Sequence, residues 1–252
     1  MKTKWLAGAL LLAFTSALYG FTNRVHGAAH RLPLSLLDRG PLLPWTAWVY
    51  ASYPLLFLAA FALEDDARRL RRYLEATLAL NLASNAFFLA FPTTLDRAPA
   101  PPGALGATLL EAVRSLDAPA NCLPSLHVST SYLAAFLAAR RSPGHGAAAF
   151  AWASAIAVST VTTKQHYAAD VFAGLLLAAA ADRYFLAPCA SPAPTRRARR
   201  SGHLGCAAAS GRPYWARSVP VGRNPRASAR PDPPRTACTR RRGAAPPHGR
   251  AR

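Results

Sequence analysis

Six apolar stretches follow one another through the first three quarters of this 252-residue chain, and short polar connections separate them. The stretches cover residues 5–21, 42–63, 74–92, 126–139, 147–163 and 167–187. Because hydrocarbon offers no hydrogen-bond partner to the backbone, apolar segments of about this length cross a bilayer as helices. The sequence therefore predicts an all-α fold, a polytopic membrane helix bundle with about six transmembrane helices.

The first stretch follows Lys2 and Lys4 and has two interpretations. A cleaved signal peptide also places basic residues before an apolar run, but no clear small-x-small cleavage site follows here. Further apolar runs do follow, so we expect the stretch to be a retained first span. The third stretch contains Asn81, Ser84 and Asn85, which should face other helices rather than lipid.

Basic residues orient the predicted bundle. They cluster before the first stretch, at 68–72 between the second and third, at Arg140 and Arg141 between the fourth and fifth, and after the sixth. With six spans, all four clusters fall on one side, which the positive-inside rule makes cytoplasmic. We therefore expect an integral protein of the plasma (inner) membrane with both termini in the cytoplasm. The connections 22–41, 93–125 and 164–166 then lie on the non-cytoplasmic face.

Composition divides the chain into three parts: a first span with its outer loop (1–41), a transmembrane domain (42–187) and a C-terminal tail (188–252). The tail holds fifteen of the 30 Lys and Arg residues but one of the 11 Asp and Glu residues, Asp232. Its Arg, Pro and Ala bias predicts disorder and attraction to anionic lipid headgroups. We do not expect it to bind nucleic acid, because it has no aromatic pattern. An out-of-frame extension is the alternative interpretation.

A first polar motif, Pro124-Ser125-Leu126-His127, stands where the outer loop becomes the fourth stretch. Pro124 and Asn121 suit the beginning of a helix, whose free backbone amides favour a phosphate. The Ser125 hydroxyl can add a donor, and His127 can give a proton near neutral pH. The alternative is a capping loop with an interfacial histidine.

A second motif contains His166 and, four residues later, Asp170, a spacing that puts two side chains on one face of a helix. A carboxylate bonded to one ring nitrogen fixes the histidine tautomer and leaves the other nitrogen free to attack. Lys164 and the loop residue Arg97 are candidate phosphate ligands. The alternatives are a buried polar pair that only joins helices and, for Lys164, a lysine extended to the membrane interface.

Two histidines, one carboxylate and nearby cations are the groups needed to move a phosphoryl group without a metal. Both motifs fall on the predicted outer face. The four cysteines show no paired metal-ligand spacing. We expect neither a metal nor another cofactor.

With these residues identified, the chain resembles the type 2 phosphatidic acid phosphatase superfamily over about residues 42–187. Pro124 to His127 is similar to the Pro-Ser-Leu-His motif of the branch that contains inositol phosphorylceramide synthases and related bacterial proteins. Ser159, His166 and Asp170 match the third motif of the family, and Arg97 takes the arginine position of the first. Two motif cations are missing, because Thr160 and Ala90 stand in their places.

The resemblance implies that His166 attacks phosphorus with Asp170 holding its ring, while His127 acts as acid and then as base. It also implies that Arg97, Ser125 and Lys164 stabilise the phosphoryl oxygens. Three functions stay open at this point. They are hydrolysis of a lipid phosphomonoester or diphosphate, transfer of a head-group phosphoryl unit to an alcohol, and a catalytically silent bundle.

Overall fold

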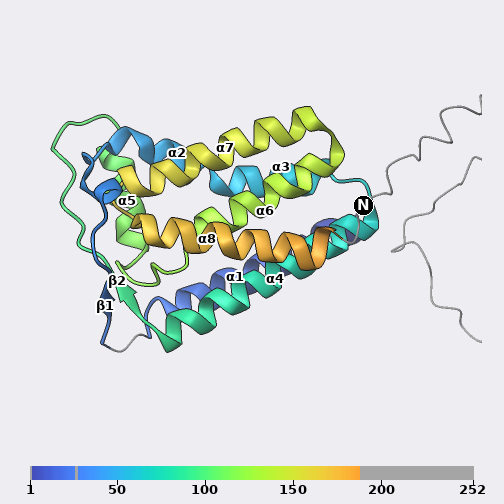
Figure 1. Ribbon diagram of the computed structural model, residues 1–252, viewed down its shortest axis with the longest axis horizontal. Helices are drawn as coiled ribbons and strands as arrows, with labels where there is room; N and C mark the ends of the chain where they lie inside the picture. The colour runs from blue at the N-terminus through green and yellow to red at the C-terminus, as the bar shows by residue number, and fades with distance from the viewer. Residues whose placement is uncertain (1, 26–27, 188–252) are drawn as a thin grey trace, which may run out of the picture. The chain divides into compact units, whose positions relative to one another are not determined.

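Helices occupy each of the six apolar stretches (Figure 1). The computed structural model describes residues 2–25 and 28–187. Its α-helices are α1 (Lys2–Thr22), α2 (Ala47–Ala51), α3 (Tyr53–Leu63), α4 (Ala67–Ala90), α5 (Ala107–Leu116), α6 (Leu126–Arg141), α7 (Pro143–Thr162) and α8 (Ala168–Ala181). Short 3-10 helices cover Leu36–Arg39 and Pro44–Thr46, and a π-helix at Asp182–Leu186 extends α8. The predictions for the tail lie outside the described residues.

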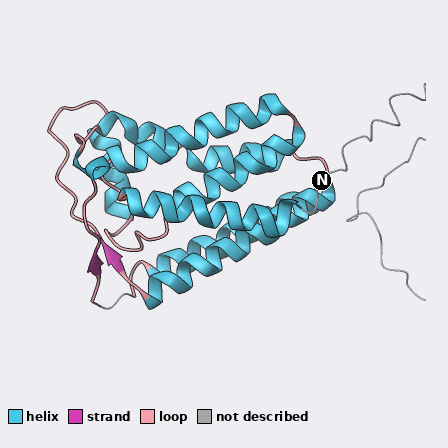
Figure 2. Ribbon diagram, viewed as in Figure 1, coloured by secondary structure: helices cyan, strands magenta, loops and turns pink. Residues whose placement is uncertain are grey.

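The connections at one end of the bundle are long and hold the little strand structure that is described (Figure 2). Strands β1 (His30–Arg31) and β2 (Thr93–Thr94) pair in parallel, with His30 opposite Thr93. This pairing joins the loop after α1 to the loop after α4, two segments that the sequence separates by about sixty residues.

The second apolar stretch forms a broken helix rather than the single helix predicted for it. α2 ends at Ala51 and α3 begins at Tyr53, with Ser52 between them. The Ser52 hydroxyl donates to the carbonyl of Val49 at 2.6 Å, and Pro54 lacks the N–H that an uninterrupted helix would use. The break lies beside a cavity described below, so it shapes the wall of that cavity.

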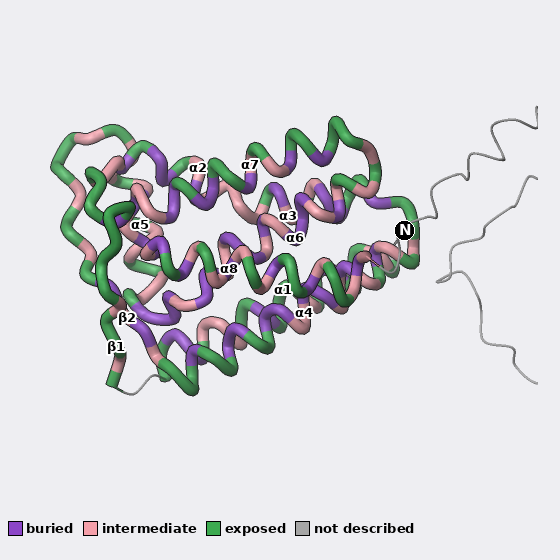
Figure 3. Tube along the Cα trace, in the orientation of Figure 1, coloured by how far each residue is buried: buried purple, intermediate pink, exposed green. Residues whose placement is uncertain are grey.

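The bundle buries polar side chains and exposes large apolar ones. Buried and exposed positions alternate along its helices (Figure 3). Asn81, Ser84 and Asn85 of α4 are buried, which confirms the prediction that they face other helices. Trp48, Phe172 and Leu176 are exposed on the outer faces of α2 and α8. Such a distribution suits a bundle surrounded by hydrocarbon. By length and hydropathy, two described stretches qualify as spans, Thr3–Thr22 and Pro44–Leu63.

The basic clusters meet at one end of the bundle. Lys4 donates to the carbonyl of Glu64 at 2.8 Å, and the Glu64 carboxylate pairs with Arg69 at 2.9 Å. Arg141 binds the carbonyl of Leu63 and pairs with Asp65 at 3.1 Å. The starts of α1 and α4 and the ends of α3 and α6 therefore lie together, as the charge pattern predicts.

At the opposite end, α8 packs closely against the start of α6. A Cβ atom at Gly174 would lie 2.7 Å from the carbonyl oxygen of Ser125, so only glycine permits this approach. The backbone N–H of Ser125 in turn donates to the carbonyl of Asp170 at 3.1 Å. These contacts bring the two polar motifs of the sequence to one place.

Candidate active site

A short turn between α7 and α8 carries His166. The carbonyl of Thr160 accepts the backbone N–H groups of both Gln165, at 2.9 Å, and His166, at 3.1 Å. Lys164 has a left-handed backbone conformation, with a φ of 55°, which lets the chain reverse here. The turn presents the His166 ring to the start of α6.

Asp170 reaches His166 by folding back over the beginning of its helix. Its Oδ2 accepts the backbone N–H of Tyr167 at 2.8 Å, in the manner of a helix capping box, and lies 3.4 Å from His166 Nδ1. The prediction that both side chains share one helix face is wrong, because His166 precedes the first helical residue, Ala168. The two side chains meet because a residue in the first helical turn points towards the residues before the helix.

The two histidines face each other through ring nitrogens. His166 Nε2 lies 3.4 Å from His127 Nδ1, whereas His166 Nδ1 lies 3.0 Å from the carbonyl oxygen of Cys122. Because a carbonyl only accepts hydrogen bonds, Nδ1 of His166 carries the proton and Nε2 has a free lone pair. In the neutral ring, the unprotonated nitrogen of His166 is therefore directed at His127.

His127 occupies the first turn of α6, where two tyrosine rings enclose it. The ring centroids of Tyr50 and Tyr53 each lie 4.4 Å from that of His127. Ser125 caps α6 by accepting the N–H of Val128 at 3.4 Å, and it is fully buried. The hydroxyl group of Ser125 can still donate its hydrogen to another group. The phosphate-binding role of Ser125 therefore stays a prediction.

The residue expected to cap this helix has another role. Asn121 donates from its side-chain nitrogen to Thr22 Oγ1 at 2.9 Å and so joins the loop to the end of α1. Thr22 in turn donates to Asn85 Oδ1 at 2.6 Å. A buried polar network thus holds the loop at Asn121, three residues before the first motif, against α1 and α4.

Arg97 lies in the loop after α4 and is engaged by the segment that ends α5. Its Nη1 donates to the carbonyl of Asp117 at 2.5 Å, and its Nη2 lies 3.5 Å from Asp117 Oδ2 and 3.4 Å from the carbonyl of Ala118. Its buried Nε has no hydrogen-bond partner among residues 2–25 and 28–187. The phosphate-binding role of Arg97 stays a prediction, and Nε is a donor that can serve it.

Lys164, the other predicted cation, is directed at the loop after α1. Its ammonium donates to the carbonyls of Asp38 and Gly40, each at 2.7 Å. Asp38 also accepts the backbone N–H of Ala168, at 2.7 Å, with its carboxylate. Two of the three ammonium donors are thus used to hold a loop across the His166 turn, and one is left for the predicted phosphate contact.

Two charged residues of the outer loop, Arg114 and Asp117, lie close to the candidate site although no motif contains them. Asp117 contacts Arg97, as described above. Arg114 donates to the carbonyl of Thr163 at 3.0 Å, next to the His166 turn, and pairs with Glu111 at 3.1 Å. Burial lowers the pKa of the Arg114 guanidinium, and Glu111 partly opposes the shift. The amphipathic pattern of 107–116 was the signal that could have found Arg114.

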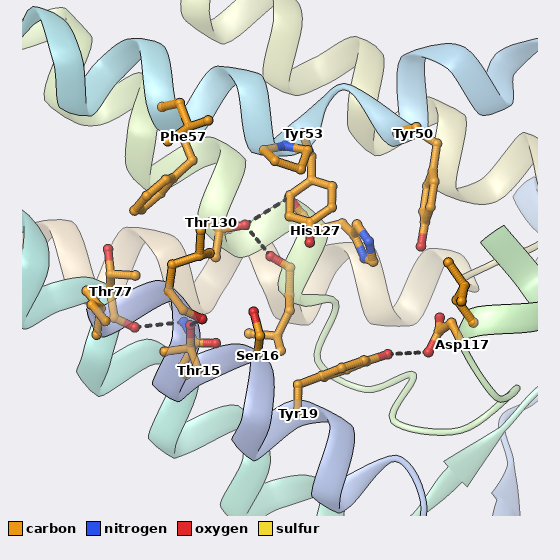
Figure 4. Close-up of a pocket in the computed structure, with 18 of the residues that line it drawn as sticks. Thr15, Ser16, Tyr19, Tyr50, Tyr53, Phe57, Thr77, Asp117, His127 and Thr130 are labelled. Atoms are coloured by element: carbon orange, nitrogen blue, oxygen red, sulfur yellow. Dashed lines mark hydrogen bonds between the residues drawn. The ribbon is translucent and has the colours of Figure 1, made fainter. Parts of the chain in front are cut away.

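A cavity of about 410 Å³ opens beside His127 (Figure 4). Its wall combines residues of α1, α2, α3, α4, α5 and α6, among them Leu12, Tyr19, Phe57, Val113 and Leu126. Asp117 lies at the same end of the cavity as Tyr19 and Tyr50 (Figure 4). His127 thus connects the histidine pair to a largely apolar chamber, with a volume typical of small-molecule sites.

The two positions where motif cations are missing have different surroundings. Ala90 is exposed at the end of α4. Thr160 is fully buried, and its hydroxyl donates to the carbonyl of Ala157 at 2.7 Å. Neither side chain can supply positive charge to the histidines.

Cys122 lies beside the histidines, but its thiol is poorly suited to act as a nucleophile. Burial and the neighbouring Asp170 carboxylate raise the pKa of the thiol far above its usual range. Over residues 2–25 and 28–187, no three His, Cys, Asp or Glu side chains gather as a candidate metal site.

Comparison with known families matches residues 17–183 to the family described as the PAP2 superfamily. That segment includes both histidines, Asp170 and the cavity wall from Tyr19 onward. No curated protein and no solved structure matches the chain.

Proposed function

The chain belongs to the PAP2 superfamily, and on this basis we propose that it is a membrane lipid phosphate phosphatase with a phosphohistidine intermediate. Membership indicates phosphatase-type chemistry at a membrane. The observation that carries the finer proposal is the 3.4 Å approach of His166 Nε2 to His127 Nδ1 at the end of an apolar cavity. That approach supports a nucleophile and a proton donor acting on one phosphoryl group.

In the first step, His166 Nε2 attacks phosphorus and forms an N–P bond while the bond from phosphorus to the lipid oxygen breaks. His127 gives a proton to the departing oxygen, which leaves as the lipid alcohol. With a lipid diphosphate, attack at the terminal phosphorus breaks the bridging P–O bond instead, and the lipid monophosphate leaves. The Cys122 carbonyl and Asp170 hold the Nδ1–H of His166 as its ring gains positive charge.

In the second step, water attacks the phosphohistidine. His127, now neutral, takes a proton from that water, the N–P bond breaks, and inorganic phosphate leaves. Arg97, Ser125, Lys164 and the backbone N–H groups at the start of α6 are the groups we assign to the phosphoryl oxygens. The scheme uses side chains that the chain itself supplies.

The cavity supports a lipid as the substrate. Several polar side chains in its wall turn their donors back onto their own helices: Thr15 to Leu12, Thr77 to Tyr73 and Thr130 to Leu126. The chamber therefore presents mainly C–H surface, which favours a hydrocarbon chain. We propose that the hydrocarbon chain of the lipid substrate lies in this cavity and that its phosphate lies at His127.

The six-span topology and the outer location of the site also belong to this proposal. Their support is that the basic residues meet at one end of the bundle and the histidines at the other. The positive-inside rule then places the histidines on the non-cytoplasmic face of the plasma (inner) membrane, with both termini in the cytoplasm.

Transfer of a phosphoryl unit to an alcohol is the second candidate, and one observation favours it. Leu126, which distinguishes this motif from the Pro-Ser-Gly-His of the phosphatases, lines the cavity next to His127. A residue at that place can affect whether water or an alcohol reaches the phosphohistidine. The two candidates differ only in this acceptor.

The test is phosphate release by detergent-purified protein, in EDTA, from phosphatidic acid, phosphatidylglycerol phosphate and a polyprenyl diphosphate. His127→Ala should lower kcat by about 10²–10⁴-fold, the usual share of a general acid and base. His166→Ala should abolish the phosphohistidine and lower kcat at least as far. His145→Ala is the matched control, because His145 is exposed and hydrogen-bonded to Ser142, and it should retain activity.

Release that His166→Ala retains would contradict the mechanism. If no substrate releases phosphate but an added alcohol becomes phosphorylated, the transferase replaces the phosphatase. If neither reaction occurs and no phosphohistidine forms, the chain is a silent bundle.

A further inference from the structure

Asp117 is a carboxylate at the cavity that the proposed reaction does not use (Figure 4). It follows the last helical residue of α5, at a helix end where the backbone dipole disfavours an anion. Helix stability therefore does not account for its presence. Both Asp117 and His127 line the cavity, so the carboxylate shares a chamber with the proton donor of the proposed reaction.

Contacts with α1 hold Asp117 in this place. The hydroxyl of Tyr19 donates to Asp117 Oδ1 at 2.7 Å. Asn23, just beyond the end of α1, accepts the backbone N–H of Ala118 at 3.0 Å. The Asp117 side chain is 18% exposed. Because both its carboxylate and its backbone are anchored, Asp117 keeps its charge near the phosphate end of the cavity.

The pairing between Asp117 and Arg97 is loose. The shortest contact of the guanidinium goes to the Asp117 carbonyl, at 2.5 Å, and the carboxylate oxygen is 3.5 Å from Nη2. Close two-point pairs between arginine and carboxylate have distances of about 2.7–2.9 Å. Arg97 is therefore neutralised by a nearby anion without being fully occupied by it.

The other cations near the His166 turn also have carboxylates beside them. Arg114 pairs with Glu111 at 3.1 Å. Lys164 binds the backbone carbonyl of Asp38, close enough to the Asp38 carboxylate for the two charges to attract each other. At the positions of the missing motif cations stand Ala90 and Thr160. Positive charge around the histidines is thus both scarce and balanced.

We propose that Asp117 is a specificity-determining residue that makes this site favour a singly charged phosphoryl group over a doubly charged one. The proposal rests on the proposed function, because it assigns the phosphate of the substrate to this site. A dianion is repelled by Asp117 twice as strongly as a monoanion, and the balanced cations give no excess attraction to offset the difference. The favoured form of a phosphomonoester substrate is the one that carries one proton, and a phosphodiester of the same charge should bind as an unreactive analogue.

The experiment compares two lipids that differ in one charge, short-chain phosphatidic acid and phosphatidylmethanol with the same acyl chains. Calorimetric titration of the His166→Ala protein in detergent measures binding without turnover. At pH 8 phosphatidic acid is mainly a dianion, because the second pKa of a phosphomonoester is about 6. Phosphatidylmethanol has one negative charge throughout, and we expect it to bind more tightly.

Asp117→Asn keeps the size of the side chain and removes its charge. We expect it to tighten phosphatidic acid binding by about tenfold and phosphatidylmethanol binding by about threefold, because the dianion is relieved of twice the repulsion. Asp117→Ser should shift the ratio of the two dissociation constants in the same direction. Asp96→Asn is the matched control, since Asp96 lies in the same loop and pairs with Arg31, and it should leave the ratio unchanged.

The outcomes distinguish a failure of the proposed role of Asp117 from a failure of the proposed phosphatase function. If both lipids bind but neither Asp117 variant changes the ratio of dissociation constants, the role of Asp117 is overturned and the proposed function stands. If neither lipid binds to any of the proteins, the proposed function itself is overturned.

Discussion

At the scale of single residues, His127 depends on aromatic packing for its orientation. The rings of Tyr50 and Tyr53 lie on either side of the break at Ser52 and contact the imidazole from two directions. Positions three residues apart also share a face in a regular helix, so the break is not needed to bring the two rings together. The broken helix nevertheless carries both rings that enclose His127.

Tyr53→Ala should lower kcat by about two- to tenfold, because aromatic pairs contribute about 0.5–1.5 kcal/mol beyond the area they bury. The variant removes the Tyr53 ring, whose centroid lies 4.4 Å from that of His127, and leaves the imidazole free to turn. Steady-state phosphate release measures the effect. Tyr53→Phe keeps the ring and should stay within about twofold of the original protein; equal losses in both variants would assign the effect to the hydroxyl instead.

At the scale of elements, the segment Leu36–Arg39 and its flanking residues act as a strap across the His166 turn. Asp38 accepts hydrogen bonds from Ser35, at 2.6 and 2.7 Å, and from the N–H of Ala168 at 2.7 Å. Lys164 binds the carbonyls on the other side of the strap. The strap therefore stabilises the beginning of α8, the helix that carries Asp170.

The strap should loosen in acid. Burial by itself raises the pKa of Asp38, but hydrogen bonds from Ser35 and Ala168, together with Lys164, outweigh it and lower the pKa overall. A carboxyl group with a lowered folded-state pKa stabilises the fold above its unfolded pKa of about 3.9, and that contribution is lost as the pH falls through the folded value. Hydrogen exchange of residues 35–40, corrected for intrinsic rates, should therefore accelerate as the pH falls below about 4.

Asp38→Asn is the control for this prediction. An amide at this position does not titrate in that range, so exchange in the variant should not depend on pH in the same way. Protection of residues 35–40 that stays constant down to about pH 2 in the original protein would show that the charge on Asp38 does not hold the strap.

At the scale of the whole described bundle, charge and chemistry separate along the helices. Basic residues and their carboxylate partners gather where α3 meets α4, and the histidines gather at the other end. Apolar side chains such as Val158 and Leu176 face outward between the two ends. A bundle of this kind is suited to a bilayer, with one end in each aqueous compartment.

Labelling from one side of the membrane tests the orientation. Asp96→Cys changes a side chain that is 70% exposed at the histidine end, and Asp65→Cys one that is 83% exposed at the basic end. In intact cells, a membrane-impermeant maleimide should label the first variant and spare the second until the cells are opened. The reverse pattern would place the histidines in the cytoplasm.

The sequence by itself was sufficient to predict helices in the six apolar stretches and to single out the two histidines, whereas α5 was not predicted. Runs of apolar residues are local and lipid tolerates little besides helices, so the positions of the helices could be predicted from composition. His127, His166 and Asp170 stand in short motifs, and the family match covers all three. The break at Ser52 was missed, because one proline in an apolar run does not establish where a helix is interrupted.

Which charges meet at the site was decided by the tertiary structure. Lys164 binds carbonyls about 125 residues away in the chain, and Arg97 meets Asp117 across a twenty-residue loop. Asp170 reaches His166 through a capped turn, and Gly174 lets α8 approach Ser125 closely. Such partners depend on how the helices pack and how the loops close, and a local sequence pattern does not predict either. A long charged side chain can also reach several partners at similar cost in free energy. The sequence thus determined which groups can do the chemistry, and the packing determined which of them are directed at it.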